Sequence, residues 1–237
     1  MDDILITRSL FGTTMAFHII FATIGVGLPL MILTAELAYQ KTKDTDFVVM
    51  AKRWTKTFSV LLGVGIPTGT IAGVQLSLLW PGFMEVIGRV MPLPFQIEIY
   101  AFFIEALFMS IYVYAAERIH PSLRIISLVL VALGALASAV LITNVHAFQG
   151  TPAGFRYENG KFLDIQPWKA FFNPSFFVTA GHVALSAYVV GAFVVASVAS
   201  FKMMRNEYGS RIYLFHQKAL FLSLILGGLT VAASFSG

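Results

Sequence analysis

Residues 95–116 read FQIEIYAFFIEALFMSIYVYAA, an apolar stretch without a basic residue. A helix of about 20 apolar residues crosses a hydrocarbon core about 30 Å thick. The stretch is therefore long enough and apolar enough to span a membrane. Five other stretches qualify on the same grounds, so we predict an all-α transmembrane bundle whose spans cover about 11–38, 57–80, 95–116, 122–144, 175–201 and 217–235.

The composition of the whole chain supports a membrane protein. Hydrophobic residues make up 57% of it and charged residues only 12%, whereas soluble domains carry about 25% charged residues. The absence of Cys excludes disulfides, thiolate-bound metals and cysteine nucleophiles. We find no internal repeat, and we treat residues 1–237 as one transmembrane domain.

The basic residues are unevenly distributed between the connections. Eleven of the 16 Lys and Arg residues lie in or beside the connections after the first, third and fifth spans. The positive-inside rule places these connections in the cytoplasm, so both termini and loop 145–174 are predicted to face outward. We therefore attribute the net charge of +4 to the orientation of the chain in the cell membrane, where lipid is its partner, and not to nucleic-acid binding. The first span lacks a cleavage signal, so we expect a retained helix.

Four ionisable side chains fall inside the predicted spans: His18, Glu98, Glu105 and His182. Charged groups in a bilayer cost roughly 2.5 to 3.5 kcal/mol on insertion scales, so they usually mark a ligand, a proton path or a buried partner. The predicted topology places all four in the outer half of the bilayer. We therefore take these residues as the candidate functional site.

The two histidines are candidate haem ligands. Small residues surround both His18 and His182, which leaves room for a flat macrocycle but also suits ordinary helix packing. A lone membrane histidine is about as often a packing residue as a ligand. Two on the same side of the membrane favour the cofactor interpretation, because neutral imidazole is a good axial ligand for haem iron.

The two glutamates share one helix. A spacing of seven residues puts Glu98 and Glu105 on one face, two turns apart. No Lys or Arg lies near the centre of any span, so both are expected to carry a proton at neutral pH. Such a pair suits a proton path, although Glu98 could alternatively approach an iron. The remaining acids near helix ends, Glu36, Glu117 and Glu207, are expected to be solvated.

Arg8 precedes the first span. Its long side chain could extend to lipid head groups. It could equally pair with a haem propionate, and the sequence alone leaves both roles open.

Several of these segments occur together in a known family. Arg8 followed ten residues later by His18, RWTKTFSVLLGVGIPTG at 53–69, IEIYAFFIEALF at 97–108 and GHVALSAY at 181–188 resemble subunit I of the cytochrome bd quinol oxidases. The resemblance runs in order along essentially the whole chain. It implies a terminal respiratory oxidase that takes electrons from quinol and reduces dioxygen to water through haems.

The resemblance also implies cofactors and partners. His182 corresponds to a ligand of a low-spin haem b. His18 corresponds to a ligand in a high-spin pair, which consists of a haem b and either haem d or a further haem b. Glu98 and Glu105 correspond to acids that protonate the oxygen site. The implied protein partners are subunit II of the oxidase and a small single-span subunit.

One departure from the family concerns length. Family members continue after the sixth span with a quinol-binding loop and further helices that complete the haem ligands. This sequence stops at AASFSG, residues 232–237, where that loop should begin. We therefore expect the chain to be truncated before the quinol loop and not to oxidise quinol unaided.

Two other functions fit parts of the pattern. A non-catalytic haem-binding module would only relay electrons. A six-span transporter would use Glu98 and Glu105 to bind protons, and Pro29 and Pro67 could kink its first two helices, but no repeated pair of interrupted helices is found. An absorption spectrum distinguishes these alternatives.

Overall fold

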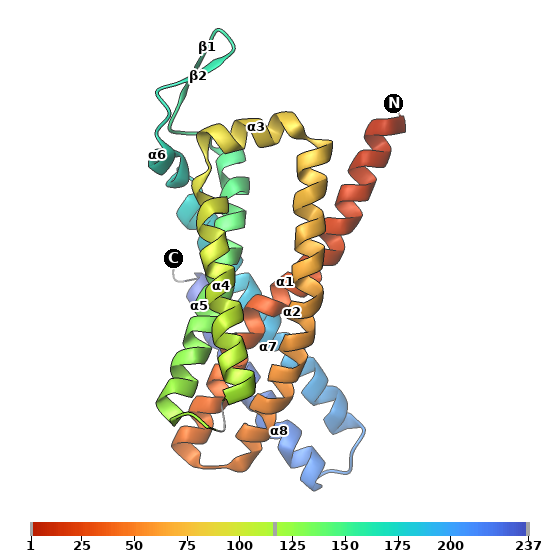
Figure 1. Cartoon of the computed structure of the whole chain (residues 1–237). Helices are drawn as coiled ribbons and strands as arrows, with labels where there is room; N and C mark the ends of the chain where they lie inside the picture. The colour runs from red at the N-terminus through yellow and green to blue at the C-terminus, as the bar shows by residue number, and fades with distance from the viewer. Residues whose placement is uncertain (1, 116–117, 236–237) are drawn as a thin grey trace.

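The computed structural model describes residues 2–115 and 118–235 and confirms the all-α transmembrane fold. Within these residues, six helices are long and apolar enough to cross a membrane. They stand side by side as a bundle (Figure 1). The spans are α1 (Asp2–Thr42), α2 (Thr45–Leu79), α4 (Leu93–Ala115), α5 (Pro121–Gly150), α7 (Phe176–Met204) and α8 (Arg211–Phe235).

The helices extend beyond the apolar stretches that predicted them. Helix α1 begins at Asp2, whereas the predicted span begins at residue 11, and α2 begins at Thr45 rather than at 57. The apolar stretch indicates the part of a helix that lies inside the bilayer, but helical hydrogen bonding continues until the backbone conformation changes. One such change occurs at Lys43, between α1 and α2, which has a φ of 58°. Ala116, the last residue of the third predicted span, and the predicted solvated acid Glu117 lie outside the described residues.

Two connections contain structure that the hydropathy pattern did not predict. Helix α3 (Pro81–Val90) links α2 to α4, and Pro81 stands at its first turn, where no backbone N–H is needed. In loop 145–174, β1 (Arg156–Glu158) pairs antiparallel with β2 (Lys161–Leu163), and the short α6 (Pro167–Phe171) follows. Asn159 and Gly160 between the strands have φ of 50° and 77°. Asn-Gly is a strong signal for such a two-residue hairpin turn.

The two ends of the bundle differ. We call the end with the connections after α1, α4 and α7 the basic end, and the end with α3 and the hairpin the hairpin end (Figure 1). The largest buried cluster gathers residues from the basic halves of the spans, including Met31, Met50, Phe58 and Leu128. Near the hairpin end the first half of α1 leans away from α4 and α5 (Figure 1).

Helices α1 and α7 cross at two glycines. A Cβ on Gly27 would lie 2.3 Å from the Ala187 carbonyl oxygen and 2.8 Å from Gly191 Cα. Glycine is therefore required for this close approach. The crossing fixes the relative height of two helices that run in the same direction, because each descends from the hairpin end to the basic end.

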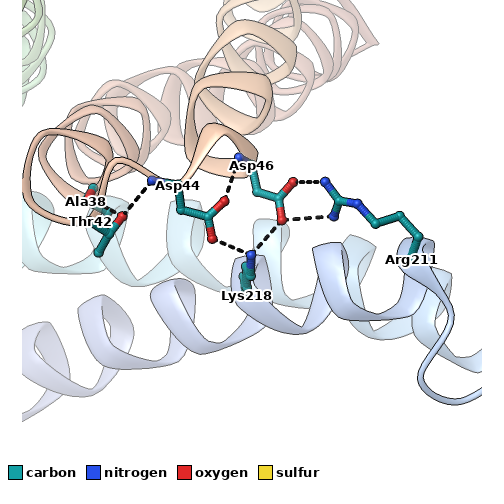
Figure 2. A network of polar contacts seen from close by, with 6 residues as sticks. All are labelled: Ala38, Thr42, Asp44, Asp46, Arg211 and Lys218. Atoms are coloured by element: carbon teal, nitrogen blue, oxygen red, sulfur yellow. Dashed lines mark hydrogen bonds and ion pairs between the residues drawn. The ribbon is translucent and has the colours of Figure 1, made fainter.

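An ionic cluster fastens the α1–α2 turn to α8 (Figure 2). Asp46 is buried and accepts hydrogen bonds from Arg211 at 2.9 Å and from Lys218 at 2.7 Å. Lys218 also bonds Asp44, whose carboxylate caps the first turn of α2. The bond from the Lys218 ammonium group holds the pKa of Asp44 below its usual value. The cluster thereby joins three spans at the basic end.

Two buried asparagines fasten the long connection at the hairpin end. Asn173 donates to Asn144 Oδ1 at 2.8 Å, and Asn144 donates to the Phe171 carbonyl at 3.0 Å. The Thr151 hydroxyl donates to Ser175 Oγ at 2.9 Å, just before α7 begins. These bonds tie the start of α7, the helix that carries His182, to the end of α5.

Candidate functional site

Glu98 and Glu105 both lie on the face of α4 that packs against α5. The Ser138 hydroxyl of α5 donates to Glu98 Oε1 at 3.2 Å. One turn along α5, Gly134 lies so close to α4 that an added Cβ would be 3.1 Å from Glu105 Cβ and 2.9 Å from the Ala101 carbonyl oxygen. The two residues thus lie along one seam, the contact between α4 and α5, and are about 10 Å apart along the axis of α4 at 1.5 Å per residue.

The acid pair has an apolar environment. Glu105 is only 5% exposed, and Glu98 is partly buried. Among the residues that the structure describes, neither carboxyl pairs with Lys, Arg or His. Because an unpaired carboxylate is costly in such surroundings, the neutral acid is the economical form and the group suits reversible protonation.

His18 lies on α1, and its side chain contacts α2. Its Nδ1 is 2.9 Å from the Thr68 hydroxyl oxygen, and that hydroxyl also donates to the carbonyls of Val64 and Gly65. Since the single hydroxyl hydrogen is directed to the backbone, Thr68 is best placed to accept from Nδ1–H. This arrangement fixes the ring and leaves the Nε2 lone pair for a ligand bond.

Gly69 provides the space beside this imidazole. A Cβ at residue 69 would lie 3.0 Å from His18 Cε1 and 3.5 Å from Nε2. Any other residue at position 69 would therefore press on the His18 ring. The oriented ring and the missing side chain beside it fit an axial ligand of a haem.

His182 lies on α7 as far from the glycine crossing as His18 lies on α1. It lies nine residues before Gly191, just as His18 lies nine residues before Gly27. Both histidines are consequently about 13 Å along their helices from the glycine crossing. The His182 side chain is exposed, and within residues 2–115 and 118–235 no hydrogen bond or ion pair engages it. A free imidazole next to Gly181, with open space around that glycine, also fits a haem ligand.

Arg8 lies on the exposed first turns of α1. In the described part of the chain its guanidinium forms no ion pair. It is therefore available to either predicted partner, a haem propionate or a lipid head group, and its role stays a prediction.

The structure groups the site residues into separate interfaces. His18 faces α2, the two glutamates face α5, and His182 is exposed on α7. Sequence reasoning identified these ionisable residues but missed their neighbours Thr68, Gly69, Gly134 and Ser138. A hydroxyl or a glycine inside an apolar helix gives no sequence signal for the partner it meets on another helix.

The prediction that Glu36 is solvated is wrong. Glu36 is 3% exposed, accepts from the Tyr112 hydroxyl at 2.7 Å and is ion-paired with Arg124. Its place near the end of an apolar stretch suggested solvent, but α1, α4 and α5 converge there and bury it. Glu207, by contrast, is exposed as predicted.

Comparisons with known proteins agree with this fold. Residues 6–236 match the family model described as cytochrome bd terminal oxidase subunit I. The chain is 72% identical over 229 residues to a Bacillus subtilis protein provisionally named a cytochrome bd menaquinol oxidase subunit I. The matched stretch covers 97% of this chain and 52% of that protein. A second relative from the same organism, cytochrome bd ubiquinol oxidase subunit 1, is 29% identical over 87% of this chain and 44% of its own length.

The similarity extends to a solved structure. The bd oxidase from Geobacillus thermodenitrificans superposes with a TM-score of 0.90 and 42% identity, over 97% of this chain and 52% of that chain. The sequence therefore spans about half the length of the relatives it matches.

Proposed function

Because the chain belongs to the cytochrome bd terminal oxidase subunit I family, we propose that it contributes six spans and two haem ligands to a membrane oxidase that oxidises quinol and reduces dioxygen to water. The observation that carries this proposal is the similarity of nearly the whole chain to a bd oxidase of known structure. The stretch that matches the family model, residues 6–236, includes His18, Glu98, Glu105 and His182.

Family membership implies haem, and the finer assignments are part of the proposal. We propose His182 as a ligand of a low-spin haem b, and His18 as a ligand in a high-spin pair of a haem b with a haem d or a further haem b. Bound haem would supply one-electron transfer and a site for dioxygen. The protein's part is to hold the His18 ring through Thr68 and to keep space free at Gly69. We also propose that Arg8 holds a propionate.

The acid seam would deliver protons to the oxygen site. Reduction of dioxygen consumes protons inside an apolar protein, so each proton needs a carrier that is neutral at rest and is protonated again after it has given its proton away. Glu105 can carry one as a carboxylic acid, and Glu98 can take it onward beside the Ser138 hydroxyl. Burial between α4 and α5 separates this route from lipid, which favours transfer along the seam.

Quinol-driven oxygen consumption tests this proposal directly. We expect the purified full-length oxidase that contains these residues, with its partner subunit, to consume oxygen when a soluble quinol is added, and a quinone-site inhibitor to stop it. Oxygen consumption that is absent in a preparation with its haems bound would contradict the proposed function. Consumption that proceeds equally without quinol would contradict the choice of electron donor.

The proposed orientation predicts opposite labelling of two exposed lysines. Lys41 lies at the basic end and Lys161 in the hairpin. In the full-length oxidase freed of other cysteines, Lys161→Cys should react with a membrane-impermeant maleimide in intact cells. Lys41→Cys should react only after the membrane is opened, because the basic connections are proposed to be cytoplasmic. Labelling of Lys41→Cys in intact cells would reverse the topology.

A further inference from the structure

The seam of α4 continues beyond the two glutamates to a third protonatable group. Tyr112 follows Glu105 by seven residues, as Glu105 follows Glu98. The three side chains therefore stand on one face of α4, each about 10 Å from the next along the axis. Tyr112 is 5% exposed and donates its hydroxyl hydrogen to Glu36 Oε1 at 2.7 Å.

Charged groups lie beside the Tyr112 hydroxyl although Tyr112 belongs to the largest buried hydrophobic cluster. Glu36 accepts from Tyr112 with one oxygen and is ion-paired with Arg124 through the other. Arg124 has a side chain that is 17% exposed, which makes it the member of this group nearest to solvent at the basic end. Its Nε atom lacks a hydrogen-bond partner among the described residues.

A purely structural role for the Glu36–Arg124 ion pair explains these contacts only in part. Replacing a buried ion pair by apolar residues is often neutral or stabilising, so the presence of one is weak support for a stability role. Here the pair lies at the basic end of a seam of acids that already requires a source of protons. Glu105, the next group along it, is buried and has no ionic partner in the described chain.

We propose that Glu36 and Tyr112 form the entry of the proton route at the basic end of the bundle and supply Glu105. The inference rests on the proposed oxidase function and deepens it. Glu36 would take a proton from the aqueous side near Arg124 and pass it to the oxygen of Tyr112. Before this transfer, the Tyr112 hydroxyl would rotate away from Glu36 toward Glu105. The phenol would then release its own hydroxyl proton toward Glu105 as its oxygen accepts the proton from Glu36, so it remains neutral and again donates to Glu36.

Met109 separates the last two groups. It lies between Glu105 and Tyr112 on the same face of α4 and is 4% exposed. The two residues are about 10 Å apart along the helix axis and no hydrogen bond joins their described side chains, so transfer requires a bridging water or a side-chain movement. An unbranched thioether can change rotamer easily, which suits a residue that must move aside.

The test removes one hydroxyl and leaves the ring. In the full-length oxidase, Tyr112→Phe keeps the packing of the ring but cannot relay a proton. Tyr114→Phe is the matched control, since Tyr114 lies two residues away on α4 and is 82% exposed. We expect Tyr112→Phe to lower oxygen consumption per haem about fivefold or more and to raise the solvent deuterium isotope effect. Quinol-driven reduction of the low-spin haem should keep its rate, and Tyr114→Phe should match the wild type.

Several results would overturn the inference. Unchanged turnover per haem in Tyr112→Phe, with only a lower melting temperature, would make the contact structural. Equal losses in Tyr112→Phe and Tyr114→Phe, or slower haem reduction, would mean general damage. If wild type consumes oxygen and Glu105→Gln is slow while Tyr112→Phe is normal, this entry fails and the proposed function stands. If wild type with its haems bound consumes none, the proposed function itself fails.

Discussion

Replacing Glu105 by Gln in the full-length oxidase is expected to lower quinol-driven oxygen consumption by roughly an order of magnitude or more. Gln keeps the size of the side chain and its capacity for hydrogen bonds but cannot release a proton. Glu105 is 5% exposed and lies where Gly134 of α5 presses against α4. Few other groups can replace it as a carrier at that depth, so the loss should be large.

The measurement is oxygen consumption per haem, beside the rate at which quinol reduces the low-spin haem. That electron-transfer rate should stay close to the wild-type value. Glu85→Gln is a suitable control, because Glu85 lies on α3, is exposed and, among the described residues, forms an ion pair only with Arg89 one turn away. Wild-type turnover in Glu105→Gln, Glu98→Gln and the double variant would mean that both acids are structural.

Replacing His182 by Ala is expected to remove the low-spin haem b completely while the bundle still forms. Ala provides no ligand for iron. The imidazole is exposed and forms no hydrogen bond or ion pair with a described residue, so its removal should cost the protein little packing. The glycine crossing at Gly27 and Gly191 remains intact and continues to hold α7 against α1. His146→Ala, at another exposed histidine near the same end of the bundle, is the control and should keep every haem.

The spans could be predicted because membrane crossing depends on apolar length, which is a local property. Their ends could not, since a helix ends where backbone geometry changes. Lys43, with its positive φ, and Pro81, at the start of α3, mark such points. Asn159–Gly160 is a sequence signal for the hairpin, but a two-residue turn does not appear in a pattern of long apolar runs.

The functional site, like the fold, could be predicted only in part. An ionisable group in an apolar stretch stands out in the sequence, which is how His18, His182, Glu98 and Glu105 were found. Their partners belong to other helices, and no local pattern pairs His18 with Thr68 or Glu98 with Ser138. Glu36 was misjudged for the same reason.

The buried cluster around Glu36 depends on contacts between distant segments. Arg124 is 88 residues from Glu36 along the chain, and Tyr112 is 76 residues away. Near the end of an apolar stretch, each of these polar residues looks like a group that meets water. Only the convergence of α1, α4 and α5 at the basic end shows that they meet one another.

The most direct measurement of the central claim is the reduced-minus-oxidised absorption spectrum of the full-length oxidase, recorded for the wild type beside His182→Ala. The account predicts haem bands in the wild type that include a low-spin haem b. It predicts that the low-spin band is absent in His182→Ala while high-spin bands remain. A wild-type protein without haem bands, or full retention of the low-spin band in the variant, would contradict the account.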